Sequence, residues 1–562
     1  MSEIVGDPIL PPDLLYLLCA ELANPQSPDF STLFECAVSS RYFATAGALS
    51  NLYKISNLSP VTGGDYEGYS FADQGLLVQK WSILWKSIIL STLDKTMYPY
   101  CRYLRVLDLR DLGFFLDHEM LRGTVSKNFF AGEMARFNMV MQTPYRTRGK
   151  MRLNIRPIML AIGDTITKQS PILEVLTEPA MLDVFSTALL EWPSRLEKLQ
   201  FLQLGTGRAL ADETLQELLV ASCPQLHKLE IYSWPNDDRS DHCMAQFLRR
   251  LRPNSLTLFQ NDSGCGIGSE TCQALALHAS SLITLHLAIG DSGIPDLGTL
   301  QPCTSLESLT LTDLRSPHDL KATQNDVFEN MVTWLQQCTK LRDLALNDFV
   351  SAPDLLTPML EKQDIQLHHL QINALRDNGL YVLKENQAFH QAISRQTSLV
   401  SLLLKADADG SFGDDVELLC NCLCAMKSLK RLNLTRTTEY FTDLHVSMLS
   451  EHLTNLEELR VDGYGITDAS LKRLSSLPHL TSLEFGGVTT FTTNGLLDFV
   501  ERLSPGNQGL ALSVERAAVE GVLSVEERIQ IRDAITAKVN GRFTYEPIAD
   551  PDISEFEGSD SD

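Results

Sequence analysis

The sequence predicts an α/β fold in which short parallel strands alternate with helices along a right-handed solenoid. Three observations lead to this prediction. The pattern Leu-x-x-Leu-x-Leu recurs through most of the 562 residues, the copies from Leu199 onward begin 24 to 35 residues apart, and amphipathic stretches separate them. This is the period of a leucine-rich repeat. The copies begin at Leu104, Leu199, Leu226, Leu282, Leu306, Leu341, Leu367, Leu399, Leu429, Leu456 and Leu480, with a degenerate copy, "PNSLTLF", from Pro253.

Each copy predicts one strand followed by one helix. In "LESLTL", the alternation of a strand turns Leu309 and Leu311 inward and Ser308 and Thr310 outward. The stretch "NDVFENMVTWLQQC" that follows has an apolar stripe at helical spacing. Because one such unit cannot bury its leucines alone, the units must stack, and parallel strands joined by helices stack with a right-handed turn.

The 12 cysteines have a structural explanation. A position that holds Leu, Met or Ala in some copies and Cys in others is a core position, in which a free thiol packs as a small apolar group. The start, "MSEIVGDP", lacks the features of a signal peptide, so we expect reduced thiols and a cytoplasmic or nuclear protein. Four cysteines lie three residues before the first leucine of a copy: Cys101, Cys223, Cys303 and Cys338.

Residues 1–56 predict a small helical domain. "LPPDLLYLLCAEL", "FSTLFECAVSS" and "RYFATAGALSNLYKI" have the periodicity of three short amphipathic helices, and we expect Leu14, Leu15, Leu18 and Leu22 on one face of the first. Three such helices have more apolar surface than they can hide among themselves. The surplus must pack either on the repeats that follow, as a cap, or on another protein.

The order of residues in this region resembles an F-box, with Leu10-Pro11 at its start, Val38-Ser39 within it and Leu52-Tyr53 at its end. "SRYFATAGALSNLYKI", "YLRVLDLRDLG" and "NLEELRVDGYGITDA" extend the resemblance, over nearly the whole chain, to a family of filamentous-fungal F-box proteins with cysteine-containing leucine-rich repeats. The resemblance implies an α/β horseshoe of the ribonuclease-inhibitor type and a substrate-recognition subunit of a Skp–cullin–F-box ubiquitin ligase. The contacts that it implies with the Skp adaptor are Leu10, Pro11, Leu14, Leu18, Leu22, Leu33, Val38 and Phe43.

The outward strand positions would line the concave face of the solenoid, and we expect a target protein to bind there. Their charges nearly cancel, and a mixed polar face with aromatic residues suits protein recognition. The alternative is a ligase-independent interaction scaffold, in which the N-terminal helices only cap the repeats. The candidates for target binding are Phe201, Lys228, Glu230, Tyr232, Phe259, His286, His369, Arg431 and Arg460.

The remaining segments complete the predicted organisation. Residues 57–75 are rich in Gly and Ser and predict a linker, after which the solenoid with its two caps occupies 76–542. Within it, 110–198 contains no clean copy, although it has room for about three degenerate repeats. A helix over 524–541, with a capping box at Ser524 and Glu527, predicts the C-terminal cap. Residues 543–562 contain no Lys or Arg and seven acidic residues, so we expect a disordered tail.

Composition and motifs argue against other classes of function. The formal charge of −24 disfavours nucleic acids and anionic membranes, and no catalytic spacing stands out. Glycines 264, 266 and 268 fit a repeat turn better than a dinucleotide site, and cysteines 420, 422 and 424 fit core packing better than a metal site. The basic stretch 145–156 is either a solvated loop or a site for an acidic partner. We therefore expect no enzyme activity, cofactor or metal; an enzyme that uses 110–198 is the weaker alternative.

Overall fold

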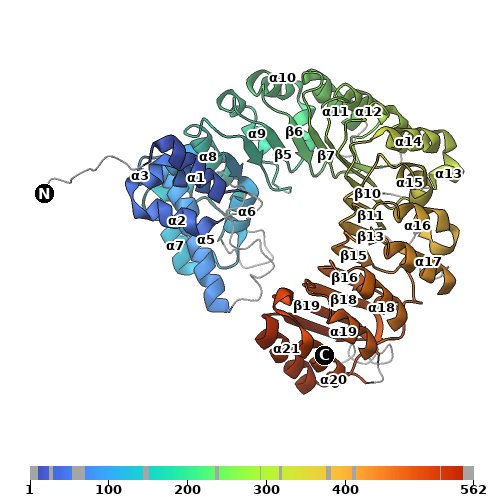
Figure 1. Ribbon diagram of the computed structural model, residues 1–562. Coiled ribbons are helices and arrows are strands. Elements are labelled where there is room, and N and C mark those ends of the chain that lie inside the picture. The colour runs from blue at the N-terminus through green and yellow to red at the C-terminus, as the bar shows by residue number, and fades with distance from the viewer. Residues whose placement is uncertain are drawn as a thin grey trace, which may run out of the picture. The chain divides into compact units, whose positions relative to one another are not determined.

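The computed structural model describes residues 10–24, 29–53, 70–142, 151–180, 182–234, 239–290, 293–314, 319–374, 381–407, 413–518 and 521–548. The chain forms two compact units, Met1–Gly266 and Ile267–Asp562. In each unit, helices cover one face of a sheet of parallel strands (Figure 1). We call the other face of each sheet the open face. The predicted alternation of parallel strands and helices is confirmed.

The first unit begins with three helical segments. They are α1 (Pro12–Leu22), α2 (Phe30–Ser39), and a third that runs through α3 (Arg41–Phe43), the π-helical stretch η1 (Ala44–Ala48) and α4 (Leu49–Leu52). Their small shared core contains Cys19, Leu33 and Ala48. Gly47 permits the close packing of the third segment on α1, because a Cβ at this position would lie 2.8 Å from the Cα of Tyr16.

The next helix, α5 (Phe71–Ser91), begins inside the predicted linker. Ser70 caps it, since its hydroxyl accepts a hydrogen bond from the backbone N–H of Asp73 at 3.3 Å. The predicted linker 57–75 is therefore too long at its C-terminal end, and its residues before Ser70 lie outside the described residues.

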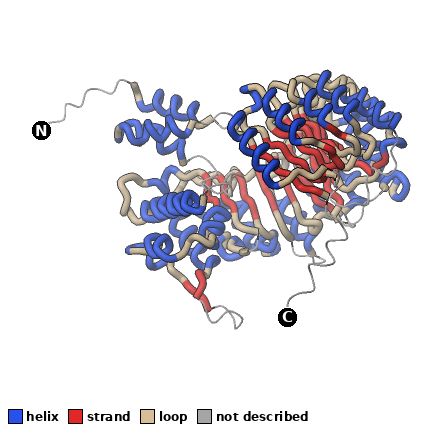
Figure 2. Tube along the Cα trace, turned by 90° about the horizontal axis from the view of Figure 1, so that it is seen from below, coloured by secondary structure: helices blue, strands red, loops and turns tan. Residues whose placement is uncertain are grey.

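An insertion replaces the degenerate repeats expected in 110–198. Strand β1 (Val106–Asp108) pairs directly with β4 (Val175–Thr177), so the sheet gains one strand over this region rather than three. Two tryptophans of α5 bind the start of the insertion. The indole N–H groups of Trp81 and Trp85 both donate to the Asp111 carboxylate, at 2.9 and 2.6 Å. An antiparallel hairpin of β2 and β3 stands apart from the parallel strands (Figure 2). The insertion contains α6 (Leu109–Asp117), α7 (Gly123–Phe129), η4 (Gly132–Phe137), β2 (Val140–Gln142), β3 (Met151–Leu153) and α8 (Ile155–Thr167).

The parallel strands of the first unit follow the order β1-β4-β5-β6-β7. Leu176, Leu202 and Leu229 stand in register on β4, β5 and β6 and are fully buried. The elements after β4 are α9 (Phe185–Ala188), η5 (Pro193–Arg195), β5 (Phe201–Leu204), η6 (Gly207–Ala211), α10 (Glu213–Ser222), β6 (Lys228–Ile231), α11 (Ser240–Arg250) and β7 (Leu258–Asn261).

One of these strands corrects the predicted register. Phe259 pairs with the buried Leu229 and is itself fully buried, so the prediction that it faces outward is wrong. The repeat begins at Leu256 rather than Pro253, because the run Leu-Thr-Leu-Phe permits two registers and the observed one buries the larger aromatic side chain.

The second unit contains strands in the order β8-β9-β10-β11-β13-β15-β16-β18-β19-β20, each parallel to its neighbours. Helices lie between most of them. The principal elements are α12 (Ser269–Ala276), β8 (Thr284–Ile289), η7 (Ile294–Leu300), β9 (Ser308–Asp313), α13 (Leu320–Thr323), α14 (Asn325–Gln337), β10 (Asp343–Asn347), α15 (Ala352–Leu360), β11 (His369–Asn373), α16 (Gln387–Ile393), β13 (Ser401–Leu404), α17 (Gly413–Leu423), β15 (Arg431–Leu434), α18 (Asp443–His452), β16 (Glu458–Val461), α19 (Asp468–Leu474), β18 (Ser482–Thr490), α20 (Thr493–Arg502), β19 (Ala511–Ala517), α21 (Val525–Val539) and β20 (Arg542–Pro547). The short strands β12 (Tyr381–Val382), β14 (Ala406–Asp407) and β17 (Ile466–Thr467) lie off this order.

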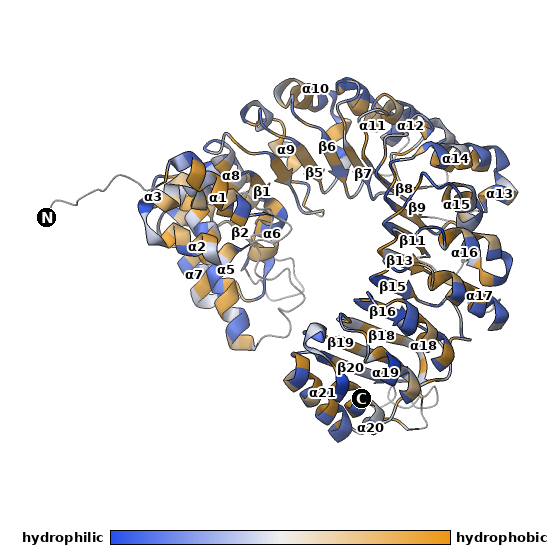
Figure 3. Cartoon of the chain, viewed as in Figure 1, coloured by the Kyte–Doolittle hydropathy of each residue, from blue (hydrophilic) through white to orange (hydrophobic). Residues whose placement is uncertain are grey.

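The repeated leucines and cysteines form the core, as their spacing predicts. Leu309, Leu344 and Leu370 stand in register on neighbouring strands and are at most 2% exposed. Cys303 and Cys338 are fully buried free thiols, and burial raises the pKa of each to about 12. Figure 3 shows the resulting alternation of hydrophobic and hydrophilic residues along the elements.

The C-terminal region differs in part from its prediction. The capping box of Ser524 and Glu527 starts α21, as predicted, and Asn540 ends the helix in the left-handed conformation at φ 52°. Strand β20 then extends to Pro547 and pairs with β19, so the prediction of disorder from 543 is wrong for these residues. Phe543 and Tyr545 give this stretch a strand-like alternation, which the acidic composition of the tail obscures. Residues 549–562 lie outside the described residues.

Candidate functional site

Helix α1 leaves an apolar face uncovered. Leu14, Leu17 and Leu18 are 48%, 62% and 54% exposed, and their spacing puts them on one side of the helix. On the opposite side, Leu15 and Cys19 are buried, so the expectation that Leu15 shares a face with Leu14 and Leu18 is wrong. The helix is thus apolar on both sides, and the core of the three helical segments accounts for only one of them.

Helix α2 repeats this arrangement. Phe30, Phe34 and Val38 recur every four residues and are 41%, 57% and 60% exposed, while Leu33 beside them is fully buried. Exposed apolar residues at helical spacing typically mark a surface that another protein covers. We call the six exposed residues of α1 and α2 the helical stripes. The described part of the repeats does not bury them, as a simple cap would require.

The eight predicted adaptor contacts separate into three groups. Pro11, Leu14, Leu18, Val38 and Phe43 are exposed, whereas Leu10 and Leu22 are half-buried. Leu33 is wrong as a contact, because it packs with Cys19 and Ala48 in the small core. Leu17, Phe30 and Phe34 are also exposed and were not among the predicted contacts. The four-residue period of Phe30, Phe34 and Val38 is the signal that could have identified the outer face of α2.

On the open face of the first unit, polar side chains satisfy one another. Tyr232 accepts hydrogen bonds from Gln203 at 2.6 Å and from Arg110 at 3.2 Å, and Gln203 also donates to Glu230 at 2.5 Å. Arg110 in turn contacts both carboxylate oxygens of Asp108. Burial raises the pKa of the Glu230 carboxyl and of the Tyr232 hydroxyl. Glu230 and Tyr232 therefore lie on the predicted face, but largely within an internal network.

The neighbouring row of this face is mainly apolar. Val175, Phe201, Lys228 and Leu258 stand in register on β4 to β7 and are half-buried. Phe201 and Lys228 thus point outward, as predicted. Leu258 takes the outward place that the sequence analysis gave to Phe259.

At the end of β4 lies a buried carboxyl group. Glu178 is fully buried and accepts hydrogen bonds from the backbone N–H groups of Phe185 at 2.7 Å and Gly205 at 3.1 Å. Burial raises the pKa of the Glu178 carboxyl to about 7 despite these bonds. It ends a repeat, Leu-Glu-Val-Leu-Thr-Glu from Leu173, whose acidic last position hid it from the sequence pattern.

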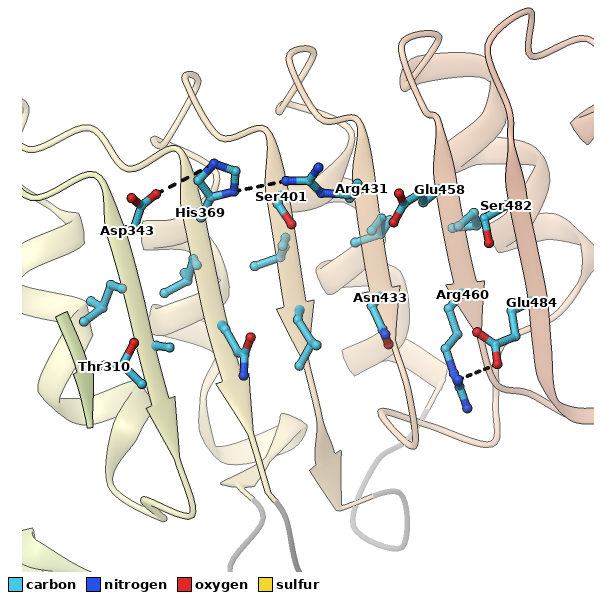
Figure 4. Close-up of a pocket in the computed structure, with 18 residues that line it drawn as sticks. Thr310, Asp343, His369, Ser401, Arg431, Asn433, Glu458, Arg460, Ser482 and Glu484 are labelled. Atoms are coloured by element: carbon cyan, nitrogen blue, oxygen red, sulfur yellow. Dashed lines mark hydrogen bonds and ion pairs between the residues drawn. The ribbon is translucent and has the colours of Figure 1, made fainter. Parts of the chain in front are cut away.

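On the open face of the second unit, a groove of about 400 Å³ crosses the strands from β9 to β18 (Figure 4). Its side chains form two rows because the strands pair in register. The first row is Asp343, His369, Ser401, Arg431, Glu458 and Ser482, and the second is Thr310, Ala345, Gln371, Leu403, Asn433, Arg460 and Glu484. Of the predicted target contacts, His369, Arg431 and Arg460 meet in this groove, whereas His286 lies on β8, where its ring nitrogen is 3.2 Å from the Ser308 hydroxyl.

The N-terminal end of the groove is electrically balanced. His369 lies between an acid and a base: one ring nitrogen is 3.7 Å from the Asp343 carboxylate, and the other is 3.4 Å from the Arg431 guanidinium. Ser401 separates His369 from Arg431 along the row, and the sticks of Figure 4 show the histidine and arginine side chains reaching across it.

The C-terminal end of the groove carries an excess of acid. The Arg460 guanidinium pairs with Glu484 at 2.5 Å and with Glu515 at 3.1 Å. A hydrogen bond between the carboxyl groups of Glu484 and Glu515 raises the pKa of Glu515 to about 7, and burial raises that of Asp462. Gly486 leaves room here, since a Cβ would lie 2.3 Å from Asp462 Oδ1.

The other motifs have structural roles. Gly266 adopts a φ of +79° in the turn after β7 and packs against Trp234, and Cys420, Cys422 and Cys424 are buried. The described residues contain no group of His, Cys, Asp or Glu that could hold a metal ion. Among the helices of the described ranges, none has the length and apolar composition that crossing a membrane requires.

Comparison with known proteins adds little to this picture. No protein-family model and no curated protein matches the sequence. Solved structures with a similar arrangement include the complex of Rad7 and Elc1 in yeast, at 15% identity over 63% of this chain and 79% of that chain, with a TM-score of 0.36. A protein from Bacteroides fragilis is 13% identical over 43% of this chain and 66% of that chain, with a TM-score of 0.26. Likeness at these scores carries no argument about function.

Proposed function

We propose that the chain is a substrate-recognition subunit of a Skp–cullin–F-box ubiquitin ligase. Helices α1 to α4 would bind the Skp adaptor, and the open faces of the sheets would bind the target. The observation that supports this most directly is the pair of helical stripes, because α1 and α2 close a core with one face and still expose leucines and phenylalanines on another. The adaptor contacts of the proposal are Leu14, Leu17, Leu18, Phe30, Phe34, Val38 and Phe43.

In this proposal the chain forms and breaks no covalent bond. Its contribution is proximity, because holding a target beside the ligase's charged ubiquitin carrier converts an encounter in solution into one within a complex. It would act in the cytoplasm or nucleus, and it would use no cofactor.

The test is co-purification of the full chain with the host's Skp adaptor. Burying a leucine contributes about 1.5–3 kcal/mol, so Leu14→Asp/Leu18→Asp should weaken adaptor binding by at least about a hundredfold. The matched control is Leu444→Asp, because Leu444 on α18 is 74% exposed and lies outside the helical stripes. The control should bind as the wild type does.

The proposal fails if the wild type does not retain the adaptor, or if the stripe variant and the control bind it equally well. Absence of binding by a folded wild type would favour the ligase-independent scaffold. The contact of the Tyr53 and Tyr100 rings at 5.5 Å, between the third helical segment and the start of the repeats, would then be part of a cap.

A further inference from the structure

The groove on the open face of the second unit has two features that together specify a ligand. One is an uncharged stretch of the second row, from Ala345 to Asn433. On β13, the two residues that line the groove outward are Ser401 and Leu403, and the second row also has Ala345 two strands away. Leu403 is half-buried in the sheet surface, so an apolar side chain placed over it would exclude water from both partners.

The other feature is the unbalanced charge at the C-terminal end. Glu458, Glu484 and Glu515 lie on the neighbouring strands β16, β18 and β19, and Asp462 directly follows β16. Arg460 contacts Glu484 and Glu515, and the backbone N–H of Arg436 donates to Asp462 at 2.7 Å. Glu458 is exposed at the edge of the groove. Two atoms here, Arg460 Nε and Asp462 Oδ1, are buried without a hydrogen-bond partner. A second cation at this end would lower the repulsion between the Glu484 and Glu515 carboxylates.

The distance between the two features determines how many residues separate the two recognised side chains of the ligand. From β13 to β18 there are three strand steps in the order β13-β15-β16-β18, each about 4.8 Å, or about 14 Å in all. An extended chain advances about 3.3–3.6 Å per residue. A segment that crosses the strands therefore places two side chains at these sites when they are about four residues apart.

We propose that this groove binds an extended segment of the target protein that carries an apolar residue and, about four residues away, a lysine or arginine. The apolar side chain lies over Leu403, and the cation lies among Glu458, Glu484 and Glu515. The inference deepens the proposed function, on which it rests for the role of the bound protein as a ligase target.

The test is selection of short random peptides displayed on phage against the full-length protein, followed by affinity measurement with a selected peptide. Selected sequences should be enriched in Lys or Arg, with an apolar residue about four positions away. Glu484→Gln/Glu515→Gln should weaken the selected peptide by about tenfold or more, and Leu403→Ser should remove the apolar preference. Binding by the wild type should strengthen as the pH rises through about 7, where Glu515 loses its proton.

A matched control distinguishes the effect of the acidic residues in the groove from the effect of the protein's overall negative charge. Glu417→Gln/Glu501→Gln removes the same two charges from exposed positions on α17 and α20 and should change the affinity by less than about twofold. Thermal melting of each variant checks that it is folded. Selection of no peptide, selection without a basic preference, or equal weakening by both pairs of substitutions would overturn the proposal.

The outcome is independent of adaptor binding. The groove variants should retain the Skp adaptor as the wild type does, because they leave the helical stripes intact. If peptides bind the groove and the adaptor does not bind, the ligase function fails and the recognition site stands. If the adaptor binds and no basic peptide is selected, the ligase function stands and the groove proposal fails.

Discussion

The open faces of the two units follow the same strand geometry and differ in what their outward residues do. In the first unit, Asp108, Arg110, Gln203, Glu230 and Tyr232 form one hydrogen-bonded network, so their polar groups are already satisfied. In the second unit, acids at the C-terminal end of the groove outnumber the bases that contact them. In both units the inward leucines form the core. The outward residues determine whether the polar groups of a face satisfy one another or leave charge that a bound partner could neutralise.

The largest expected effect is common to both units. Leu202 in the first unit and Leu402 in the second are at most 1% exposed at equivalent inward positions. Each replacement by Ala should lower the free energy of unfolding by about 2–5 kcal/mol, because it removes packed methyl groups and leaves a cavity. Urea titration followed by circular dichroism measures this. A cost well below this range in one unit alone would show that its core relaxes around the cavity.

The buried carboxyl of the first unit should give a pH dependence. The pKa of Glu178 in the fold, about 7, exceeds the ordinary 4.5, so folding favours the protonated form. The stability that this proton provides is fully present below pH 4.5 and is lost as the pH rises through about 7. Glu178→Gln removes the titration, so the free energy of unfolding of this variant relative to the wild type should rise by about 3 kcal/mol over this range. Urea midpoints measured across that range test it, and parallel curves for the two proteins would contradict it.

The smallest expected effect distinguishes the two open faces. Asp108 caps α6 through the backbone N–H of Arg110 at 2.9 Å and also accepts from the Thr177 hydroxyl at 2.6 Å. Asp108→Ala should therefore cost about 1–2 kcal/mol. The Asp343 carboxylate lies 3.7 Å from a ring nitrogen of His369, and both side chains are more than 40% exposed. Asp343→Ala should cost less than about 0.5 kcal/mol. Equal costs in thermal or urea unfolding would mean that the faces do not differ as described.

The sequence predicted the strands well wherever the repeat ended on an apolar residue. It failed where the pattern admitted another residue or another register. The repeat that contains β4 has the acidic Glu178 at its last position, and the run before Phe259 allows two registers. It assigned Leu33 to the wrong side of α2, because on a helix that is apolar on two faces the spacing alone does not tell which face the core uses.

The sequence predicts which single residues of the groove point outward, but not which of them contact one another across strands. Alternation along a strand predicts that His369, Arg431 and Arg460 point outward. Which charges meet across strands depends on side-chain reach: Arg460 contacts Glu515, on a strand 55 residues further along the chain. The surplus of acid therefore becomes visible only when the strands are placed side by side.

The burial of the cysteines also sets how the protein would respond to oxidants. Ten of the 12 thiols are buried, and the two half-exposed ones are Cys36 on α2 and Cys265 in the turn before Gly266. Because the thiolate is the reactive form, a raised pKa keeps core thiols such as Cys303 and Cys338 inert as well as inaccessible. An oxidant or a labelling reagent would meet Cys36 and Cys265 first. In Cys265→Ser, a dye on Cys36 would report from the same helix that carries Phe34 and Val38.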